Sequence, residues 1–592
     1  MMEDRFSVLL FRTCLVGCLL GSVGTIYFLL GLAGYVGSSL LNLFVAASLV
    51  AATVFFLAAF IGALWETNWV GRILWLSIFV ILGTEIILCL VPPTARDELT
   101  HHLAIPQLYV RAGKIIEVPM APYSYFPMLL DMLYTPWVYW GYDSVSKFIH
   151  GLFAFLTGLS LYAYLSRRMN AVYGLVGFFF HLSAVGASLE SLGLRRSRYN
   201  LLLYGSAFVH SSLARRQDRR AMADHGCFIC RIRGSHEAQW VSGMVAIIFL
   251  FAWVAVRETE QGLGKILSNC VLFAAVGALP FLPWLAKNWL QTGNPFSPAG
   301  WVFPCEDWNR GRRCRVTSAW EFSPSASFST ASWWQITALP LRLFFFGRDD
   351  DPQYFDGVLG PSLILLLPWA FKGEVARGKK LLVSFSVLFF AYALFLVDLR
   401  ARYILPIVPP MVILFTYGVF NVYLRLKQPA YLFAALFGFA TFNGYYLWRY
   451  FQDVAPLGYV TGQETRVAYL TRALPEYPAF QYINRELSPT TKIYLLFVGR
   501  RGYYCEREYF HDGGELPGFL LRAINPRKNR QTWLAGSKQE QLTHLLVRDD
   551  LLIRFLRDNL DPAQQRLWDA FTANHLKSLF RDRGYSVLQL HD

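Results

Sequence analysis

The sequence predicts a polytopic α-helical membrane protein, with about 11–13 transmembrane helices, that ends in a small soluble α/β domain. Of its 592 residues, 55% are hydrophobic and only 16% are charged, and the mean hydropathy is +0.34. A soluble protein of this size would be more polar. We therefore assign residues 1–456 to a multi-span membrane domain and residues 457–592 to the soluble domain.

Apolar runs that approach the ~20 residues needed to cross a bilayer follow one another along the membrane domain. They cover residues 8–32, 39–64, 72–91, 151–165, 171–187, 243–256, 266–286, 358–371, 381–398, 404–424 and 430–450. The first run lacks a clear small-residue cleavage site, so we expect a retained helix and not a removed signal peptide.

Basic residues in three short loops predict the orientation, because cytoplasmic loops carry an excess of lysine and arginine. These loops contain Arg167 and Arg168; Lys372, Arg377, Lys379 and Lys380; and Arg425 and Lys427. If they are cytoplasmic, the loop after residue 91, the loop after Lys287 and the tail from about residue 457 face the outer side. The net charge of +15 then reflects membrane topology and a basic insert, and no nucleic-acid partner is expected.

The most informative stretch is residues 94–114, which directly follows a predicted span and Pro92-Pro93. Asp97 and Glu98 are adjacent there, and His101 and His102 follow each of them by four residues, a spacing that forms pairs on a helix. Carboxylates beside a bilayer are costly unless they are solvated, paired or used in function. One interpretation is a solvated loop that caps a helix. The other is a catalytic carboxylate at the membrane surface.

An aromatic segment with two prolines, residues 126–140 (FPMLLDMLYTPWVYW), follows this loop. Aromatic residues favour the membrane interface. The pattern predicts an interfacial or re-entrant helix that roofs the carboxylate site, and an ordinary short span is the alternative.

Residues 188–240 differ from their surroundings. They contain nine arginines, no lysine and four acidic residues, and they show poor helical periodicity. We hypothesise that this anomalous stretch was translated in a shifted reading frame, at the expense of two spans.

Two further predicted outer loops contain charged residues. Arg400 and Arg402, next to Tyr403, lie on the side where basic residues are disfavoured. A guanidinium fork suits phosphate oxygens, although snorkelling to lipid head groups is the alternative. The aspartates of residues 349–351 suit a divalent cation, and a solvated acidic loop is the alternative there.

The tail has the pattern of a small α/β domain. Strand-like runs occur at residues 492–498, 543–547 and 585–590, and helical runs at 478–487 and 551–560. No glycine fingerprint for a nucleotide is present, so we expect an accessory or substrate-docking role.

These segments together resemble the GT-C glycosyltransferases, polytopic enzymes that use polyprenyl-phosphate-linked sugars, such as protein O-mannosyltransferases and the aminoarabinose transferase of lipid A. Residues 97–115, 287–295, 349–360 and 400–406 carry the resemblance. In that family an acidic residue of the first large outer loop is the catalytic base, and Asp97 matches it; Glu98 matches the second acid. Three predicted spans precede this loop, where the best-known members have one, and residues 188–240 lack the family's pattern.

The resemblance implies an inverting transfer of a sugar from a polyprenyl-phosphate donor to a hydroxyl of a glycolipid, polysaccharide or protein. It places the active site and the tail on the outer face of a bacterial inner membrane. The catalytic residues would be Asp97 and Glu98, and the substrate-binding residues His101, His102, Lys287, Arg400, Arg402 and Tyr403. The rival from another class is a transporter or lipid flippase, which would bury charges near the midplane and show repeated halves.

Overall fold

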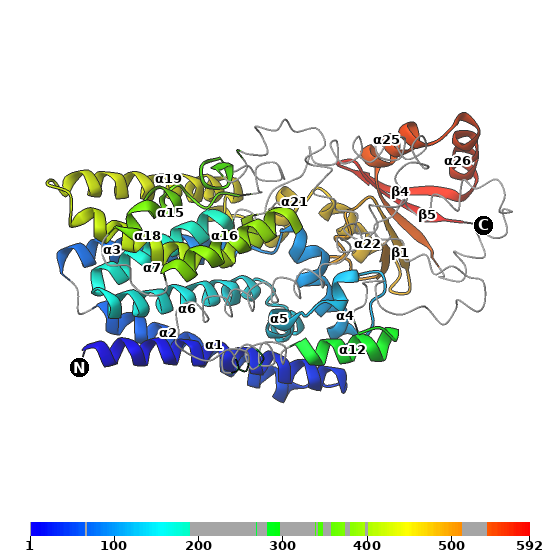
Figure 1. The fold of residues 1–592 in the computed structure, drawn as a ribbon. Coiled ribbons are helices and arrows are strands. Elements are labelled where there is room, and N and C mark those ends of the chain that lie inside the picture. Colours follow the sequence, from blue (N-terminus) through cyan, green and yellow to red (C-terminus); the bar gives the residue numbers. More distant parts are fainter. Residues whose placement is uncertain are drawn as a thin grey trace.

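The computed structural model describes residues 2–64, 68–189, 281–295, 341–346, 357–372, 379–396, 401–511 and 542–591, with residues 264, 268, 271 and 338. A bundle of long helices carries a small sheet-containing domain at one end (Figure 1). The chain enters the bundle at the opposite end. It leaves the bundle through α19 (Ala430–Val454), and α20 (Leu457–Val460) leads into the sheet domain.

Five of the described helical segments are long and apolar enough to cross a membrane. They are Arg5–Leu32 in α1 (Met2–Leu32), Ser39–Gly62 in α2 (Ser39–Leu64), α3 (Trp69–Leu90), α6 (Val145–Arg168), and Leu405–Tyr423, which joins η8 (Leu405–Ile407) to α18 (Val408–Tyr423). On α3, Ile78 and Leu82 are buried in the bundle while Leu76 and Val80 are exposed. A helix that is apolar on all sides is typical of a membrane protein.

Shorter apolar helices match other predicted runs. They are α7 (Ala171–Leu189), α15 (Ser362–Leu365) with η7 (Leu367–Phe371), and α16 (Lys379–Leu396), which is followed by α17 (Ala401–Ile404). The predicted run 243–256 and the anomalous stretch 188–240, except for its first two residues at the end of α7, lie outside the described residues. The run 266–286 is described mainly at its end, where α12 (Leu282–Thr292) begins. The structure therefore supports a membrane protein with five candidate spans.

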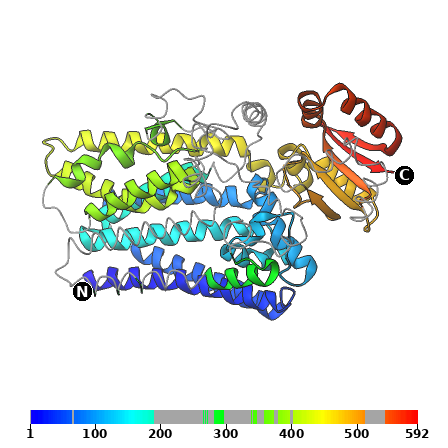
Figure 2. The same cartoon turned by 45° about the vertical axis from the view of Figure 1, so that its right-hand side comes forward.

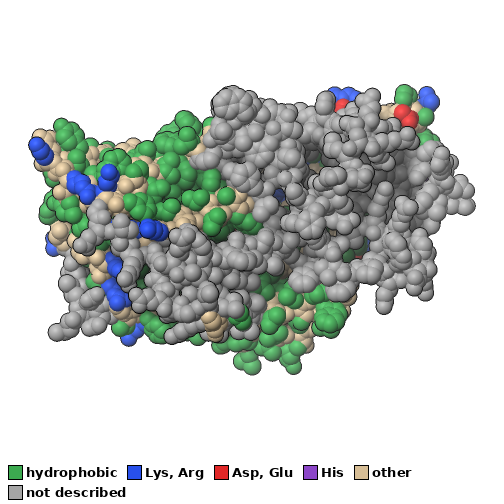
Figure 3. All heavy atoms as spheres, viewed as in Figure 1, with side chains coloured by type: hydrophobic (Ala, Val, Ile, Leu, Met, Phe, Trp, Pro, Cys, Tyr) green, Lys and Arg blue, Asp and Glu red, His purple; other side chains and the backbone are tan. Residues whose placement is uncertain are grey.

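Lysine and arginine side chains gather at the end of the bundle that lies away from the sheet domain (Figure 3). There α6 ends at Arg168, and the Arg425 guanidinium donates a hydrogen bond to the carbonyl of Lys372 at 3.2 Å. The loop that follows α3, residues 91–103, contains Asp97 and Glu98 and is called the acidic loop below. It lies at the other end of the bundle, where the Tyr504 hydroxyl of the sheet domain donates a hydrogen bond to the Pro93 carbonyl. The predicted basic loops and the predicted acidic loop are thus at opposite ends of one bundle.

The described part of the tail forms one mixed five-stranded sheet in the order β2-β1-β3-β5-β4 (Figure 2). Its strands are β1 (Lys492–Leu496), β2 (Glu508–His511), β3 (His544–Arg548), β4 (Leu576–Asp582) and β5 (Tyr585–Leu590). β1 runs parallel to β2 and β3, whereas β5 is antiparallel to β3 and β4.

Helices cover both faces of this sheet. The described helices of the domain are α21 (Arg466–Ala473), α22 (Tyr477–Glu486), α25 (Asp549–Asn559) and α26 (Pro562–His575). Phe480 of α22 belongs to the same buried cluster as Ile493 and Leu495, while Trp568 of α26 clusters with Tyr494 and Leu496. Alternate residues of β1 therefore pack against different helices, as expected of a strand buried on both faces.

The predicted strands at 492–498, 543–547 and 585–590 and the predicted helices at 478–487 and 551–560 are confirmed with small shifts of their ends. The strands β2 and β4 and the helices α20, α21 and α26 were not predicted from the sequence.

Candidate active site

The loop that follows α3 is fixed at its start. Val91, at the C-cap of α3, has an extended backbone (φ −71°, ψ 152°), and Pro92 and Pro93 continue the chain without donating amide hydrogens. The ammonium of Lys147, on α6, donates to the carbonyls of Val91 at 3.0 Å and Pro92 at 3.3 Å. These bonds satisfy carbonyls that the end of a helix leaves without partners.

Glu98 folds back over this loop. Its Oε2 atom accepts hydrogen bonds from the amides of Thr94 at 3.2 Å and Ala95 at 3.0 Å. Burial raises the pKa of the Glu98 carboxyl, while the Lys147 ammonium and the Ala95 amide oppose that rise. Glu98 therefore acts as a cap that shapes the loop from within.

Asp97 lies immediately before a turn of π-helix, η1 (Glu98–His102), whose Leu103 amide bonds the Glu98 carbonyl at 3.0 Å. π turns are rare and occur frequently at functional sites. Asp97 and Glu98 are both partly exposed, unlike the buried residues 91–95 just before them. The two adjacent acids differ in how they are held, because Glu98 accepts hydrogen bonds from the Thr94 and Ala95 amides of its own loop.

The predicted histidines form an aromatic group on the same turn. Tyr123 stacks on the His101 ring, with centroids 4.2 Å apart and planes at 17°, and the His101 and His102 rings are 4.1 Å apart. The Nδ1 atom of His101 lies 2.9 Å from the Thr100 hydroxyl. Nδ1 of His102 lies 2.9 Å from a carboxylate oxygen of Asp131.

Asp131 belongs to the candidate site but was not predicted from the sequence. It lies in the first turn of α5 (Leu129–Tyr139), and its side chain is 6% exposed, whereas that of His102 is 40% exposed. Burial raises the pKa of Asp131, and the neighbouring His102 opposes that rise. A lone acid within the aromatic segment 126–140 was the available signal, because a buried carboxylate needs a partner.

Helix α5 occupies the position expected of a roof element. It has 11 residues, or about 16 Å of helix, which is too short to cross a bilayer. It packs beside α4 (Ala104–Ala112), which follows the acidic loop, and lies near the sheet-domain end of the bundle (Figure 1). Deeper in, the Tyr134 hydroxyl of α5 bonds the imidazole Nε2 of His150 on α6.

Lys287 is brought to the same end of the bundle by α12, but its side chain points into the protein. The residue is 2% exposed, and its ammonium donates to the carbonyl of Ser124 in η2 (Pro122–Tyr125). The neighbouring Asn288 amide donates to the Tyr125 carbonyl at 2.9 Å. α12 therefore supports the segment that carries Tyr123.

The remaining predicted ligands are not described in atomic detail. Arg400 and the aspartates at 349–351 lie outside the described residues. Arg402 and Tyr403 belong to α17, of which only the backbone is described at these positions. Within the described part of the chain, no group of three or more His, Cys, Asp or Glu side chains could hold a metal ion.

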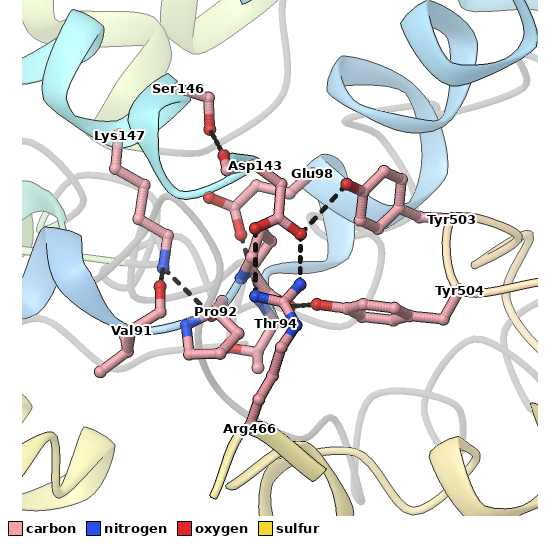
Figure 4. A network of polar contacts seen from close by, with 11 residues as sticks. Val91, Pro92, Thr94, Glu98, Asp143, Ser146, Lys147, Arg466, Tyr503 and Tyr504 are labelled. Carbon is pink, nitrogen blue, oxygen red and sulfur yellow. Dashed lines mark hydrogen bonds and ion pairs between the residues drawn. The ribbon is translucent and has the colours of Figure 1, made fainter. Parts of the chain in front are cut away.

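The sheet domain contacts the acidic loop directly, and this contact was not predicted from the sequence either. Asp143, just before α6, binds Arg466 of α21 and the hydroxyl of Tyr503 (Figure 4). The Tyr503 amide donates to the Leu99 carbonyl at 3.3 Å. The site is therefore built from the membrane bundle and from the tail.

Neither a family model nor a curated protein matches this sequence. A partly exposed carboxylate, a histidine held by a buried aspartate and an aromatic platform meet at the boundary between an apolar bundle and a polar domain. This set is suited to accept a proton from a hydroxyl group and to bind a polar substrate beside a membrane.

Proposed function

We propose that this protein is a membrane glycosyltransferase of the GT-C type, which moves a sugar from a polyprenyl-phosphate donor to an acceptor hydroxyl with inversion. The observation that carries the proposal is the position of Asp97. This residue is partly exposed, on a loop whose backbone is fixed by Lys147, Glu98 and the sheet domain. A base must be held in place to be effective, and this loop has the contacts that hold it.

In the proposed reaction the acceptor oxygen attacks the anomeric carbon of the sugar while Asp97 takes the hydroxyl proton. The new carbon–oxygen bond forms as the bond from that carbon to the phosphate oxygen breaks, and the lipid phosphate leaves with the electron pair. One direct displacement inverts the anomeric carbon. The pKa of Asp97 needs little tuning, because the hydroxyl becomes acidic mainly as the new bond forms.

The histidine pair has a binding role in this scheme. Asp131 fixes the orientation of the His102 ring through Nδ1, as buried carboxylates commonly do for functional histidines. Tyr123 stacks on the His101 ring and thereby fixes the position of that histidine beside the acidic loop. We assign His101 and His102 to substrate binding, and Arg400, Arg402 and Tyr403 to the departing phosphate, where growing charge needs stabilisation.

The proposal includes a full bundle of about 11–13 spans and an outer-side location of the acidic loop and tail. Transfer of a radiolabelled sugar from polyprenyl-phosphate donors in proteoliposomes tests it. We expect labelled acceptor to accumulate in proportion to enzyme. Donor flux across the bilayer without labelled product would instead identify a transporter or flippase.

A further inference from the structure

The loop of residues 500–506 in the sheet domain forms hydrogen bonds with the acidic loop on both sides of Asp97. The Tyr504 hydroxyl donates to the carbonyl of Pro93 at 2.6 Å, before Asp97, and the Tyr503 amide donates to the carbonyl of Leu99 at 3.3 Å, after it. Further along, the Arg111 guanidinium at the end of α4 donates to the Cys505 carbonyl at 2.8 Å. Asp97 lies between the first two contact points.

An ion pair between a buried carboxylate and a partly exposed arginine joins the same two parts of the protein. The Arg466 guanidinium makes two bonds to the Asp143 carboxylate, at 3.2 and 2.5 Å, and the Tyr503 hydroxyl adds a third at 3.1 Å (Figure 4). The Asp143 side chain is 4% exposed. Two-pronged arginine–carboxylate pairs fix relative orientation as well as distance. The pair therefore sets how α21 lies against the start of α6.

The 500–506 loop is itself rigidly attached to the sheet domain. The Asn484 side chain of α22 bonds the Tyr504 carbonyl and the Glu506 amide, both at 2.9 Å. Arg501 forms a 2.8 Å ion pair with the buried Glu476. Gly502 fits only without a side chain, because a Cβ atom there would lie 2.1 Å from the Tyr509 ring. The loop therefore transmits the position of the whole domain.

We propose that the sheet domain is a positioning element of the active site, which holds the acidic loop in its working conformation through Tyr503, Tyr504 and the Arg466–Asp143 pair. This goes beyond the accessory or docking role expected for such a tail. It concerns the geometry of the loop, so it holds for any reaction that Asp97 serves.

Hydrogen exchange of the acidic loop tests the proposal without an activity assay. The variants are Tyr504→Phe, which removes one hydroxyl, and Arg466→Lys, which keeps the charge but loses the fork. We expect amides in residues 94–103 to exchange about fivefold to tenfold faster in each variant, the effect of losing one net hydrogen bond. A double variant should exchange faster than either single one.

Two matched controls lie in the same domain. Arg472, also on α21, makes a two-pronged pair with Glu464 of the tail at 3.0 and 2.9 Å, so Arg472→Lys perturbs an equivalent bond away from the loop. Tyr482 of α22 stacks on Phe580 within the domain, so Tyr482→Phe is the tyrosine control. Both should leave exchange in residues 94–103 at the wild-type level.

Steady-state kinetics distinguish a positioning role of these residues from an effect on overall protein stability. If transfer activity is found, Arg466→Lys and Tyr504→Phe should lower kcat with little change in KM for the donor, because loop position matters most in the transition state. Wild-type exchange in residues 94–103 in both variants would overturn the proposal, even with an active enzyme. Faster exchange in a protein without transferase activity would support the positioning role and remove the proposed reaction.

Discussion

The two ends of the membrane bundle use charge differently. At the end away from the sheet domain, cations mostly satisfy carbonyls of nearby helix ends: Arg425 bonds the Lys372 carbonyl, and Lys379 bonds the Ala370 carbonyl at 2.8 Å. At the sheet-domain end, buried acids meet partners from distant parts of the chain, as Asp131 meets His102 and Asp143 meets Arg466.

This difference points to the sheet-domain end of the bundle as the place of the candidate site. Burying a charge costs several kcal/mol unless its partner is well placed, and buried pairs are not a general source of stability. The sheet-domain end holds two buried acids near the acidic loop, each with a partly exposed partner, whereas the basic end needs only membrane topology to explain it. The comparison predicts large effects of substitutions at one end and small effects at the other.

Protease accessibility gives the largest expected contrast, because it is all or none. In intact spheroplasts, added protease should remove the tail beyond Val454, while cytoplasmic marker proteins survive. Loops of the basic end should be cut only after lysis. Complete protection of the tail before lysis would invert the topology and place Asp97 on the cytoplasmic side.

Asp97→Asn should come next, with a loss of about 10²–10⁴ in kcat, because the amide keeps the shape of the side chain but cannot take a proton. Donor binding should stay near the wild-type level, as measured by retention of labelled lipid on the purified protein. Asp569→Asn on the exposed face of α26 is a matched control that should leave turnover unchanged. Normal turnover in a folded Asp97→Asn protein rules out the base assignment.

Asp131→Asn should lower kcat/KM by roughly tenfold to a hundredfold, since the His102 ring loses a charge-assisted hydrogen bond. If Asp131 acts through His102, then His102→Gln should cause a similar loss, and the double variant should add little to it. Additive losses in the double variant would show that the two residues act independently. The measurement is steady-state transfer at varied donor concentration.

Substitution of Glu98 should change the free energy of unfolding more than it changes turnover. Glu98→Ala removes the cap on the Thr94 and Ala95 amides and should lower the free energy of unfolding by about 1 kcal/mol, whereas Glu98→Gln keeps an acceptor oxygen. Because burial raises the pKa of Glu98 in the folded protein above its ordinary value of about 4.5, the unfolded state loses its proton first. The Glu98 contribution to stability should therefore fall as pH rises above about 4.5 and level off above the folded pKa.

Thermal unfolding in detergent at several pH values measures this effect. The decline of stability above pH 4.5 should be shallower in Glu98→Gln than in the wild type. Equal slopes in the two proteins would mean that the carboxyl is not stabilised in its protonated form.

Arg425→Gln at the basic end should have the smallest effect. Among the described residues, the Arg425 side chain makes one hydrogen bond, which is exposed, so the change in unfolding free energy should stay within about 0.5 kcal/mol and turnover should not change. A tenfold loss of turnover in this variant would break the contrast between the two ends. The same transfer assay and thermal scan serve as the measurements.

Local sequence patterns predicted many of the described helices and strands. Apolar runs located the five candidate spans, and the continuous apolar residues of β1 and β3 located the centre of the sheet. β4 was missed because its sequence, LKSLFRD, is largely exposed and lacks an apolar run. At the site, the Asp97-Glu98 pair and the two histidines stood out by spacing alone.

Other site residues could not be found in this way, because their partners are far along the chain. Asp143 is 323 residues from Arg466, and Pro93 is 411 residues from Tyr504. Nothing in the local sequence of either member predicts the other. The capping role of Glu98 could not be predicted either. Adjacent acids look the same in the sequence, and only the fold shows that the Glu98 carboxylate accepts hydrogen bonds from the Thr94 and Ala95 amides.

The long separation between Asp143 and Arg466 has a consequence for biosynthesis. At a synthesis rate of ~5–20 residues per second, the ribosome needs about 16–65 s to make the intervening chain. Throughout that interval a nascent chain already inserted in the membrane has an acidic loop without the contacts supplied by residues 466–505. The candidate site can thus mature only after translation has passed residue 505, so a chain released early would carry every residue of the acidic loop and still lack these contacts.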